Sequence, residues 1–290
     1  MNSEPAHQSS PKVNLIGVIS PVPATPFSVK MLDELTRQLG ERGYLTLLLP
    51  VDAHPDLLQK TRQLALAGLI CLEAPASNML AALKESLPYP VIPVCSSSAD
   101  AEDSVSINDH AAAEQIGRLL ADQPHQRFGY LQGRAGAEPS RRLAGYIAGL
   151  QVAGQKVEVL TAGDSDRESA YQAMMRYLKQ ARASERINAL FCENDLLAFG
   201  AMQAIRDFGQ GAHIGVAGFD DSDEAGTSTW HLTSWAQPYA LLVTEALNRL
   251  LENRREEEGA WREGELRIRH SHLAKAAPGE MAKCGCASRH

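Results

Sequence analysis

The sequence lacks the apolar segments that would send a chain into or across a membrane. Its start, MNSEPAHQSSPK, is polar and contains no apolar stretch of the kind found in secretory signals. No run in the 290 residues approaches the roughly 18 consecutive apolar residues of a membrane-spanning helix. We therefore expect a cytoplasmic protein without a membrane partner.

Positive charge is also scarce, since 28 lysines and arginines stand against 35 aspartates and glutamates, for a formal net charge of −7. Domains that bind nucleic acid on their own usually carry a basic stripe or patch, and the sequence contains none. We therefore expect these residues not to bind DNA by themselves.

Motifs for cofactor and metal chemistry are missing as well. The segment after the first apolar run is SPVPATPF, where a dinucleotide-binding fold would have G-x-G-x-x-G. There is no phosphate-binding loop, no G-x-S-x-G elbow, no H-E-x-x-H motif and no cluster of cysteine and histidine at metal-binding spacing. Carboxylates occur, but no serine and histidine complete a recognisable triad. The sequence thus predicts no enzyme, no cofactor and no bound metal.

Cysteine is rare, with five in the chain. Cys71, Cys95 and Cys192 lie in apolar runs, which predicts buried, reduced thiols. Cys284 and Cys286 stand in a polar tail close to the last residue. A solvated, disordered end is the favoured interpretation of that tail, and a metal or redox role is the alternative.

What the chain does contain is a regular alternation of short apolar runs and helical segments. Helical spacing is clear at Phe27, Met31, Leu35 and Leu39. Such alternation predicts an α/β fold of parallel sheets with helices on both faces, and the pattern leaves open one sheet or two. Residues 266–268 are a candidate for one more strand. The main predicted strands are residues 15–19, 45–49, 69–72, 91–95, 128–131, 157–160, 189–192 and 214–219.

Ligands of such sheets bind outside the carboxyl ends of the strands, where this sequence has polar side chains. Arg142 opens a helix, and its guanidinium suits hydroxyls or a carboxylate, with a surface arginine as the alternative. Asn194, Asp220 and Asp109 have helix caps or turns as their ordinary interpretation. Phe27 suits stacking on a sugar ring or the core of its helix. Together these residues suit a polyhydroxylated ligand. The strand-end segments are residues 20–27, 51–54, 73–77, 96–98, 133–142, 193–195 and 220–223.

An ordered series of segments resembles a known family. The series begins with LIGVISPVPATPF, ERGY, AGLICLEAP, PYPVIPVCS and VSINDHAAAEQIGRLLAD, and it continues with RFGYLQG, SRRLAGYIAGL, ALFCENDLLAFGAMQAI, IGVAGFDD and LTSWAQPYALLVTEAL. Over about residues 12–272 it is similar to the effector-binding domain of LacI/GalR (lactose-repressor-like) transcriptional regulators. No single segment is decisive, whereas the ordered set is specific.

The resemblance implies a type I periplasmic-binding-protein-like fold, with two doubly wound parallel-sheet lobes, three crossovers and a ligand cleft between the lobes. By this resemblance, residues 12–122 and 237–254 form the N-terminal lobe, and residues 124–235 and 262–273 form the C-terminal lobe. Residues 1–11 and 274–290 are expected to be disordered.

The resemblance also implies the residues that contact the ligand. Asp109, Arg142, Asn194 and Asp220 occupy the family's contact positions, and Gln237 joins them near the hinge. Ser20, Thr25 and Phe27 shape the pocket. We expect Asp109 and the segment 20–27 to close onto the ligand from the lobe opposite Arg142.

As a regulator, the protein is expected to form a homodimer through segments 27–42 and 55–66, and to sense a sugar or sugar derivative. Family members carry a helix-turn-helix of about sixty residues ahead of this domain. Here about eleven polar residues precede the first strand, so DNA contact is expected only through a head that this chain lacks.

Three other classes stay open. A solute-binding protein of a transporter shares the fold but needs an export signal. An enzyme needs a nucleophile, metal or cofactor loop. A headless corepressor-like partner differs only in lacking a DNA-binding head. The ligand also stays open among hexoses, pentoses, sugar acids, sugar phosphates and nucleobases, although carboxylates around one arginine favour neutral polyols.

Overall fold

The computed structural model describes residues 14–20, 25–50, 63–72, 77–94, 104–136, 139–151, 154–209 and 213–273. The chain divides into two compact units, unit 1 with residues 1–106 and 239–258, and unit 2 with residues 107–238 and 259–290. The backbone therefore passes between the units three times, as the resemblance implies. The expected disordered ends, Cys95, Cys284 and Cys286 lie outside the described residues.

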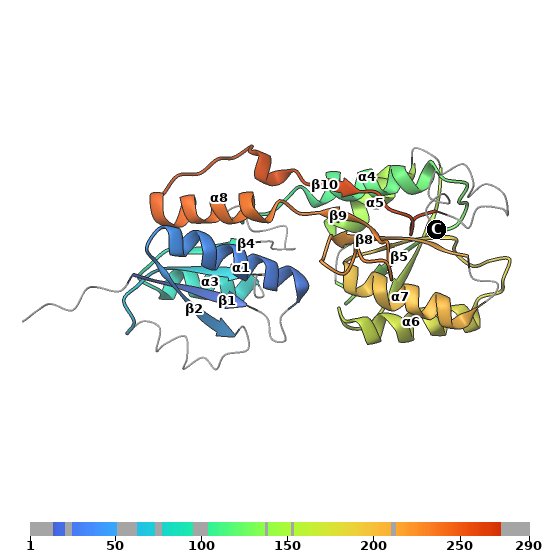
Figure 1. Ribbon diagram of the computed structural model, residues 1–290, viewed down its shortest axis with the longest axis horizontal. Helices are drawn as coiled ribbons and strands as arrows, with labels where there is room; N and C mark the ends of the chain where they lie inside the picture. The colour runs from blue at the N-terminus through green and yellow to red at the C-terminus, as the bar shows by residue number, and fades with distance from the viewer. Residues whose placement is uncertain are drawn as a thin grey trace, which may run out of the picture. The chain divides into compact units, whose positions relative to one another are not determined.

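Unit 1 is built on a parallel sheet of the order β2-β1-β3-β4. Its strands are β1 (Leu15–Ser20), β2 (Leu45–Pro50), β3 (Leu66–Leu72) and β4 (Val91–Val94). Helices α1 (Pro26–Glu41) and α8 (Tyr239–Glu252) pack against each other beside this sheet (Figure 1). Helix α3 (Ser77–Ser86) packs through Leu80 and Leu83 onto Ile19 and Leu69. Gly68 of β3 has no side chain, so its backbone packs closely against the side chain of Leu250 in α8.

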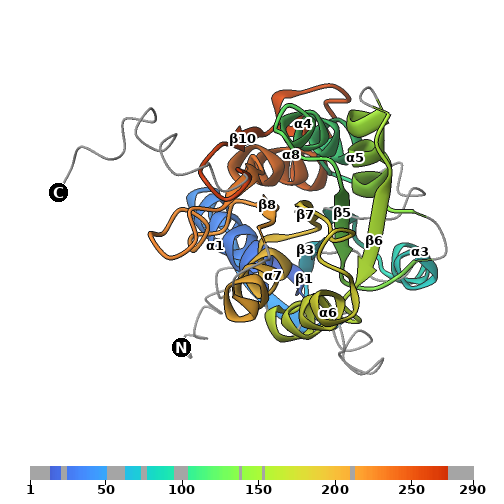
Figure 2. The same cartoon turned by 90° about the vertical axis from the view of Figure 1, so that its right-hand side faces the viewer.

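Unit 2 is built on a sheet of the order β10-β9-β8-β7-β5-β6, in which only β10 runs antiparallel to its neighbour. Its strands are β5 (Phe128–Gln132), β6 (Val157–Thr161), β7 (Ala189–Cys192), β8 (Gly215–Asp220), β9 (Thr233–Ala236) and β10 (Glu265–Arg267). Figures 1 and 2 show helices α4 and α5 on one face of this sheet and α6 and α7 on the other. Their bounds are α4 (Asp109–Ala121), α5 (Arg141–Gln151), α6 (Arg167–Gln180) and α7 (Asp195–Phe208), and η1 (Ala260–Arg262) precedes β10.

The two units differ from the two expected lobes in the position of helix α4. Residues 107–122 were expected in the first lobe, whereas the structure assigns them to unit 2. The reason is a close helix pair, because glycines of α5 let its backbone touch α4. A Cβ added to Gly145 would lie 2.1 Å from the carbonyl oxygen of His110, and one on Gly149 would lie 2.4 Å from that of Glu114. Helix α4 is therefore held to α5 by backbone contact that only glycine allows.

The predicted strands are confirmed within the described residues, and the candidate strand at residues 266–268 is present as the short β10. The sequence pattern left open whether these strands form one sheet or two, and in the structure they form two. Strand β9 was not predicted. Cys71 and Cys192 are buried free thiols, as expected, and burial raises the pKa of Cys71 to about 12. None of the helices in the described part of the chain is long and apolar enough to cross a membrane.

Candidate functional site

The structure gathers charged side chains around Arg142 in unit 2, at the carboxyl ends of its strands. Arg142 is the second residue of α5, and its Nε donates to Oδ1 of Asp109 in the first turn of α4 at 2.7 Å. Its Nη1 donates to the backbone oxygen of Glu193, directly after β7, at 2.7 Å. Asp220 is the last residue of β8, and its carboxylate attracts the same guanidinium by charge. We call Arg142, Asp109, Glu193 and Asp220 the Arg142 cluster.

The guanidinium of Arg142 lies over the ring of Phe219. Its Cζ is 3.7 Å from the ring centroid of Phe219, a distance at which a cation and a ring face attract each other. Phe219 in turn stacks on Trp235 with 5.3 Å between ring centroids, and both rings are buried. The side chain of Arg142 remains 20% exposed, and its Nη2 has no hydrogen-bond partner among the described residues. The arginine is thus fixed in place with donors left for a ligand.

The charge balance of the Arg142 cluster is negative. Burial acts to lower the pKa of Arg142, but the carboxylates of Asp109, Asp220 and Glu193 outweigh burial and raise this pKa above the ordinary arginine value. The guanidinium therefore stays charged. Three carboxylates around one guanidinium leave an excess of two negative charges, which repels anions and accepts hydrogen bonds from hydroxyl groups.

Asp220 stands in a strained backbone conformation. Its φ is +98° and that of Asp221 is +46°, in the left-handed region that non-glycine residues seldom adopt. Such residues cost on the order of 1–3 kcal/mol each and persist where surrounding contacts hold them. Gln237 provides one contact, because its Nε2 donates to Oδ1 of Asp220 at 2.6 Å. Gln237 thus lies beside Asp220, and the contact of both residues with a ligand stays a prediction.

Helix capping explains the position of Asn194 but not that of Asp109. Asn194 is the N-cap of α7, since its Oδ1 accepts from the backbone N–H of Leu197 at 2.9 Å. Its half-buried amide nitrogen makes no hydrogen bond to a described residue and is available to a ligand. For Asp109 the capping interpretation is wrong, because Asn108 caps α4 and leaves the carboxylate of Asp109 to Arg142.

Glu193 belongs to the Arg142 cluster but was not among the residues predicted to contact the ligand. Its Oε2 accepts from the backbone N–H of Gly133 at 3.1 Å, and its Oε1 accepts from the hydroxyl of Tyr130 at 3.4 Å. These bonds point the carboxylate toward the strand ends. The strand-end rule covers position 193, so its place directly after an apolar strand was the available signal.

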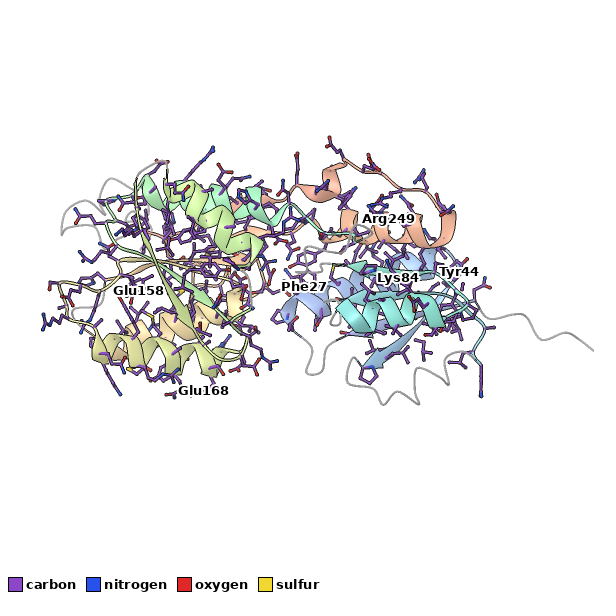
Figure 3. All side chains as sticks on the ribbon, turned by 180° about the vertical axis from the view of Figure 1, so that it is seen from behind. Phe27, Tyr44, Lys84, Glu158, Glu168 and Arg249 are labelled. Carbon is purple, nitrogen blue, oxygen red and sulfur yellow. The ribbon has the colours of Figure 1, made fainter. Side chains whose placement is uncertain are left out.

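The remaining predicted residues belong to unit 1 and are explained there by local structure. Thr25 caps α1 in a reciprocal capping box with Ser28. Phe27, labelled in Figure 3 at the start of α1, is 6% exposed and packs on Tyr239 with ring centroids 5.8 Å apart. The hydroxyl of Ser20 is buried without a hydrogen-bond partner among the described residues. The contact of these three residues with a ligand stays a prediction.

Asp109 also departs from the expectation. It was expected to act from the lobe opposite Arg142, whereas both residues lie in unit 2 and form an ion pair there. Across the described ranges, no three histidine, cysteine, aspartate or glutamate side chains group in a way that could hold a metal ion.

Comparison with known proteins gives a family and close relatives in sequence. The family described as periplasmic binding proteins and sugar binding domain of LacI family matches residues 14–261. The HTH-type transcriptional repressor PurR of Escherichia coli O1:K1 is 30% identical over 259 residues, which cover 83% of this chain and 74% of the repressor. PurR of Salmonella arizonae matches with the same identity and coverage.

Solved structures share the fold. A LacI family transcriptional regulator from Lactobacillus casei with bound sucrose has a TM-score of 0.75 and 21% identity, and the match covers 89% of this chain and 100% of that one. A LacI family regulator from Enterococcus faecium with bound ribose has a TM-score of 0.74 at 20% identity, with 90% and 99% coverage. The transcription regulator CcpA of Lactococcus lactis reaches 0.76 at 19% identity, with 90% and 99% coverage.

Proposed function

This chain belongs to the family of periplasmic binding proteins and sugar-binding domains of LacI regulators, and we propose that it senses a neutral, sugar-like effector through the Arg142 cluster. The observation that carries the proposal is the guanidinium of Arg142, fixed on Phe219 and ringed by carboxylates. A sugar hydroxyl can donate to a carboxylate and accept from a guanidinium, so such a set suits several neighbouring hydroxyls. Two structures of similar fold carry sucrose and ribose, which supports a sugar.

The charge of the cluster selects among the ligand classes that the sequence left open. An excess of two negative charges opposes a sugar phosphate or a sugar acid, because bringing a further anion close to partly buried carboxylates is unfavourable. A neutral hexose or pentose meets no such repulsion. The amide nitrogen of Asn194 and the donors of Arg142 provide the complementary hydrogen bonds.

The output of effector binding is proposed to be regulation of transcription. The relatives that are 30% identical are repressors, which favours a regulator over a transporter protein or an enzyme. With a net charge of −7, the chain is unsuited to hold DNA itself, so DNA contact is assigned to a helix-turn-helix in the intact homodimer. An effector shifts the DNA-binding equilibrium only by its differential affinity for the two states, and DNA shifts effector affinity by the same factor.

A thermal-shift series tests the proposed ligand class. The chain is heated with D-ribose, D-glucose, sucrose, gluconate, glucose 6-phosphate and NAD⁺ in turn. A ligand at about 100 times its Kd stabilises the native state by about 2.7 kcal/mol, which raises Tm by roughly 5–10 °C for a chain of this size. At least one neutral sugar is expected to give such a shift. A shift with NAD⁺ alone would favour an enzyme, and a shift with only the anionic compounds would contradict the charge argument.

The matched control uses a second arginine of unit 2. Arg142→Ala is expected to abolish the sugar-induced shift. Arg134→Ala removes an arginine that is 75% exposed and paired with Asp164, and it should leave the shift unchanged. Equal shifts in the two variants would remove Arg142 from the site.

A further inference from the structure

Asp195 carries a buried carboxylate that neither the capping of α7 nor the Arg142 cluster uses. It is the first residue of α7 and is 2% exposed, and the N-cap of that helix is Asn194. Its Oδ2 accepts from the backbone N–H of Ser222 at 2.6 Å, and its Oδ1 accepts from the hydroxyl of Ser234 at 2.6 Å. Both short bonds are buried, so the carboxylate joins α7 to the turn after β8 and to β9.

The hydroxyl of Ser234 extends this contact to the preceding residue of the turn. It accepts from the backbone N–H of Asp221 at 3.0 Å while donating to Asp195. Two consecutive backbone N–H groups after Asp220 are thus held, one by Asp195 directly and one through Ser234. Asp221 is itself left-handed, and Ser222 directly follows the left-handed pair Asp220 and Asp221. No glycine in the turn makes that conformation easy, so the hydrogen bonds offset its strain.

The strand beneath the carboxylate is shaped around it. A Cβ added to Gly218 of β8 would lie 2.4 Å from Oδ1 of Asp195, and any side chain there would displace the carboxylate. The turn has a second tie, because Nη1 of Arg269 lies 2.7 Å from Oδ1 of Asp221. Asp195 therefore holds the backbone N–H groups of the turn, directly and through Ser234, and Arg269 holds the side chain of Asp221.

We propose that Asp195 is a positioning residue that clamps the turn 220–222 and so fixes the direction of the Asp220 carboxylate for the effector. The clamp itself follows from the contacts of Asp195, Ser222 and Ser234. Its consequence for a ligand rests on the proposed function, in which Asp220 accepts a hydroxyl. Loss of the clamp relaxes Asp220 toward ordinary backbone conformations and moves its carboxylate away from Arg142.

The protonation state of Asp195 makes the clamp sensitive to pH. The titratable groups that face it are the Asp221 carboxylate from the turn, itself paired with Arg269, and the Cys192 thiol from β7. Strands β8 and β9 contribute Gly218 and Ser234, which do not titrate. Burial raises the pKa of Asp195 to about 6, although the bonds from Ser234 and Ser222 lower it. Below this pH one carboxyl oxygen carries a proton and acts as a donor, so the bonds from Ser222 and Ser234 no longer have a charged carboxylate as their acceptor and are weakened.

The test compares Asp195→Asn with the parent chain, with Asp166→Asn as the matched control. Asp166 caps α6 by accepting from Ser169, and asparagine caps a helix equally well. The first readout, without ligand, is the protection of the Asp221 and Ser222 amides from hydrogen exchange, corrected for intrinsic rates. Asp195→Asn is expected to lower both protection factors about tenfold at pH 7.5, and Asp166→Asn to leave them unchanged. Unchanged protection in Asp195→Asn would overturn the clamp.

The second readout is the Kd of the neutral sugar with the largest thermal shift, measured by calorimetry at pH 7.5 and pH 5.0. The parent is expected to lose about tenfold in affinity at pH 5.0, whereas Asp195→Asn binds about tenfold more weakly and equally at both values. Lost protection with parental affinity would overturn the link to Asp220. If no sugar binds the parent, the proposed function fails, and the protection factors still decide the clamp. Should Asp195→Asn not fold, Ser234→Ala removes the bonds of the Ser234 hydroxyl to Asp221 and Asp195, keeps the bond from the Ser222 N–H to Asp195, and is judged by the same readouts.

Discussion

Arg142 and Asp109 are ion-paired at 2.7 Å between the first turns of two helices that touch backbone to backbone. The pair lies within unit 2 and connects helix packing to the candidate site. Asp109 consequently orients Arg142, and the donors of Arg142 that Asp109 and Glu193 leave over are the ones that we propose for a ligand.

Asp109→Asn is expected to destabilise the fold by about 1–2 kcal/mol, because it removes one partner of a partly buried charge pair and leaves the guanidinium among fewer carboxylates. Urea denaturation of the parent and the variant measures the difference. The matched control is Asp164→Asn, whose carboxylate pairs with an exposed arginine and should show no measurable change. A variant as stable as the parent would mean that the ion pair contributes nothing to the fold.

Asp220→Ala is expected to abolish sugar binding and to leave the fold intact. The carboxylate is one of the acceptors of the Arg142 cluster, and it accepts a hydrogen bond from the side chain of Gln237. Asp223→Ala changes an exposed aspartate directly after the turn 220–222; this variant is the control and should bind as the parent does. Equal ligand-induced Tm shifts in Asp220→Ala and the parent would contradict the assignment of Asp220.

The pH dependence of stability offers a separate check on Asp195. Its folded pKa of about 6 lies above the ordinary aspartate value of 3.8, so the folded state binds the proton more tightly than the unfolded state does. The resulting stability is fully present below about pH 4 and is lost as pH rises through about 6, for a total on the order of 2–3 kcal/mol. Asp195→Asn cannot titrate, so its unfolding free energy should lack this decline between pH 4 and pH 7. Denaturant curves at five pH values measure the unfolding free energy of the parent and of Asp195→Asn. If the two free energies change with pH in parallel, Asp195 is not the group that causes the decline.

The strands were predictable because buried parallel strands are continuous apolar runs, as in Leu66–Leu72 and Gly215–Asp220. Strand β9 escaped the same rule. Thr233 and Ser234 are fully buried yet polar, and they are satisfied by Ser271, His272 and Asp195. A buried polar pair is compatible with a core only when distant residues supply its hydrogen bonds, and no local pattern reveals those partners.

The candidate site was predictable by position and less so by role. Arg142, Asp220 and Asn194 stand at strand ends, where the fold class places ligands. Glu193 and Asp195 stand there as well, but a carboxylate before a helix has capping as its ordinary interpretation. Their roles depend on Gly133 and on Ser234, which lie 60 and 39 positions away in the sequence. The division into two units came from the family resemblance, because composition and periodicity fit one sheet or two.

Gly145→Ala tests whether helix contact maintains the Arg142–Asp109 pair. The new Cβ would lie 2.1 Å from the carbonyl oxygen of His110, which is backbone and cannot move as a side chain does. Helices α4 and α5 must separate, which is expected to cost about 1–3 kcal/mol and to weaken sugar binding, because Asp109 moves with α4. Gly40→Ala is the control, since its Cβ meets nothing within 4 Å in helix α1. It should stabilise the chain by about 0.5–1 kcal/mol and leave binding unchanged. Denaturation and calorimetry on both variants separate the two effects, and a destabilised Gly145→Ala that binds sugar with parental affinity would show that the site does not depend on this helix contact.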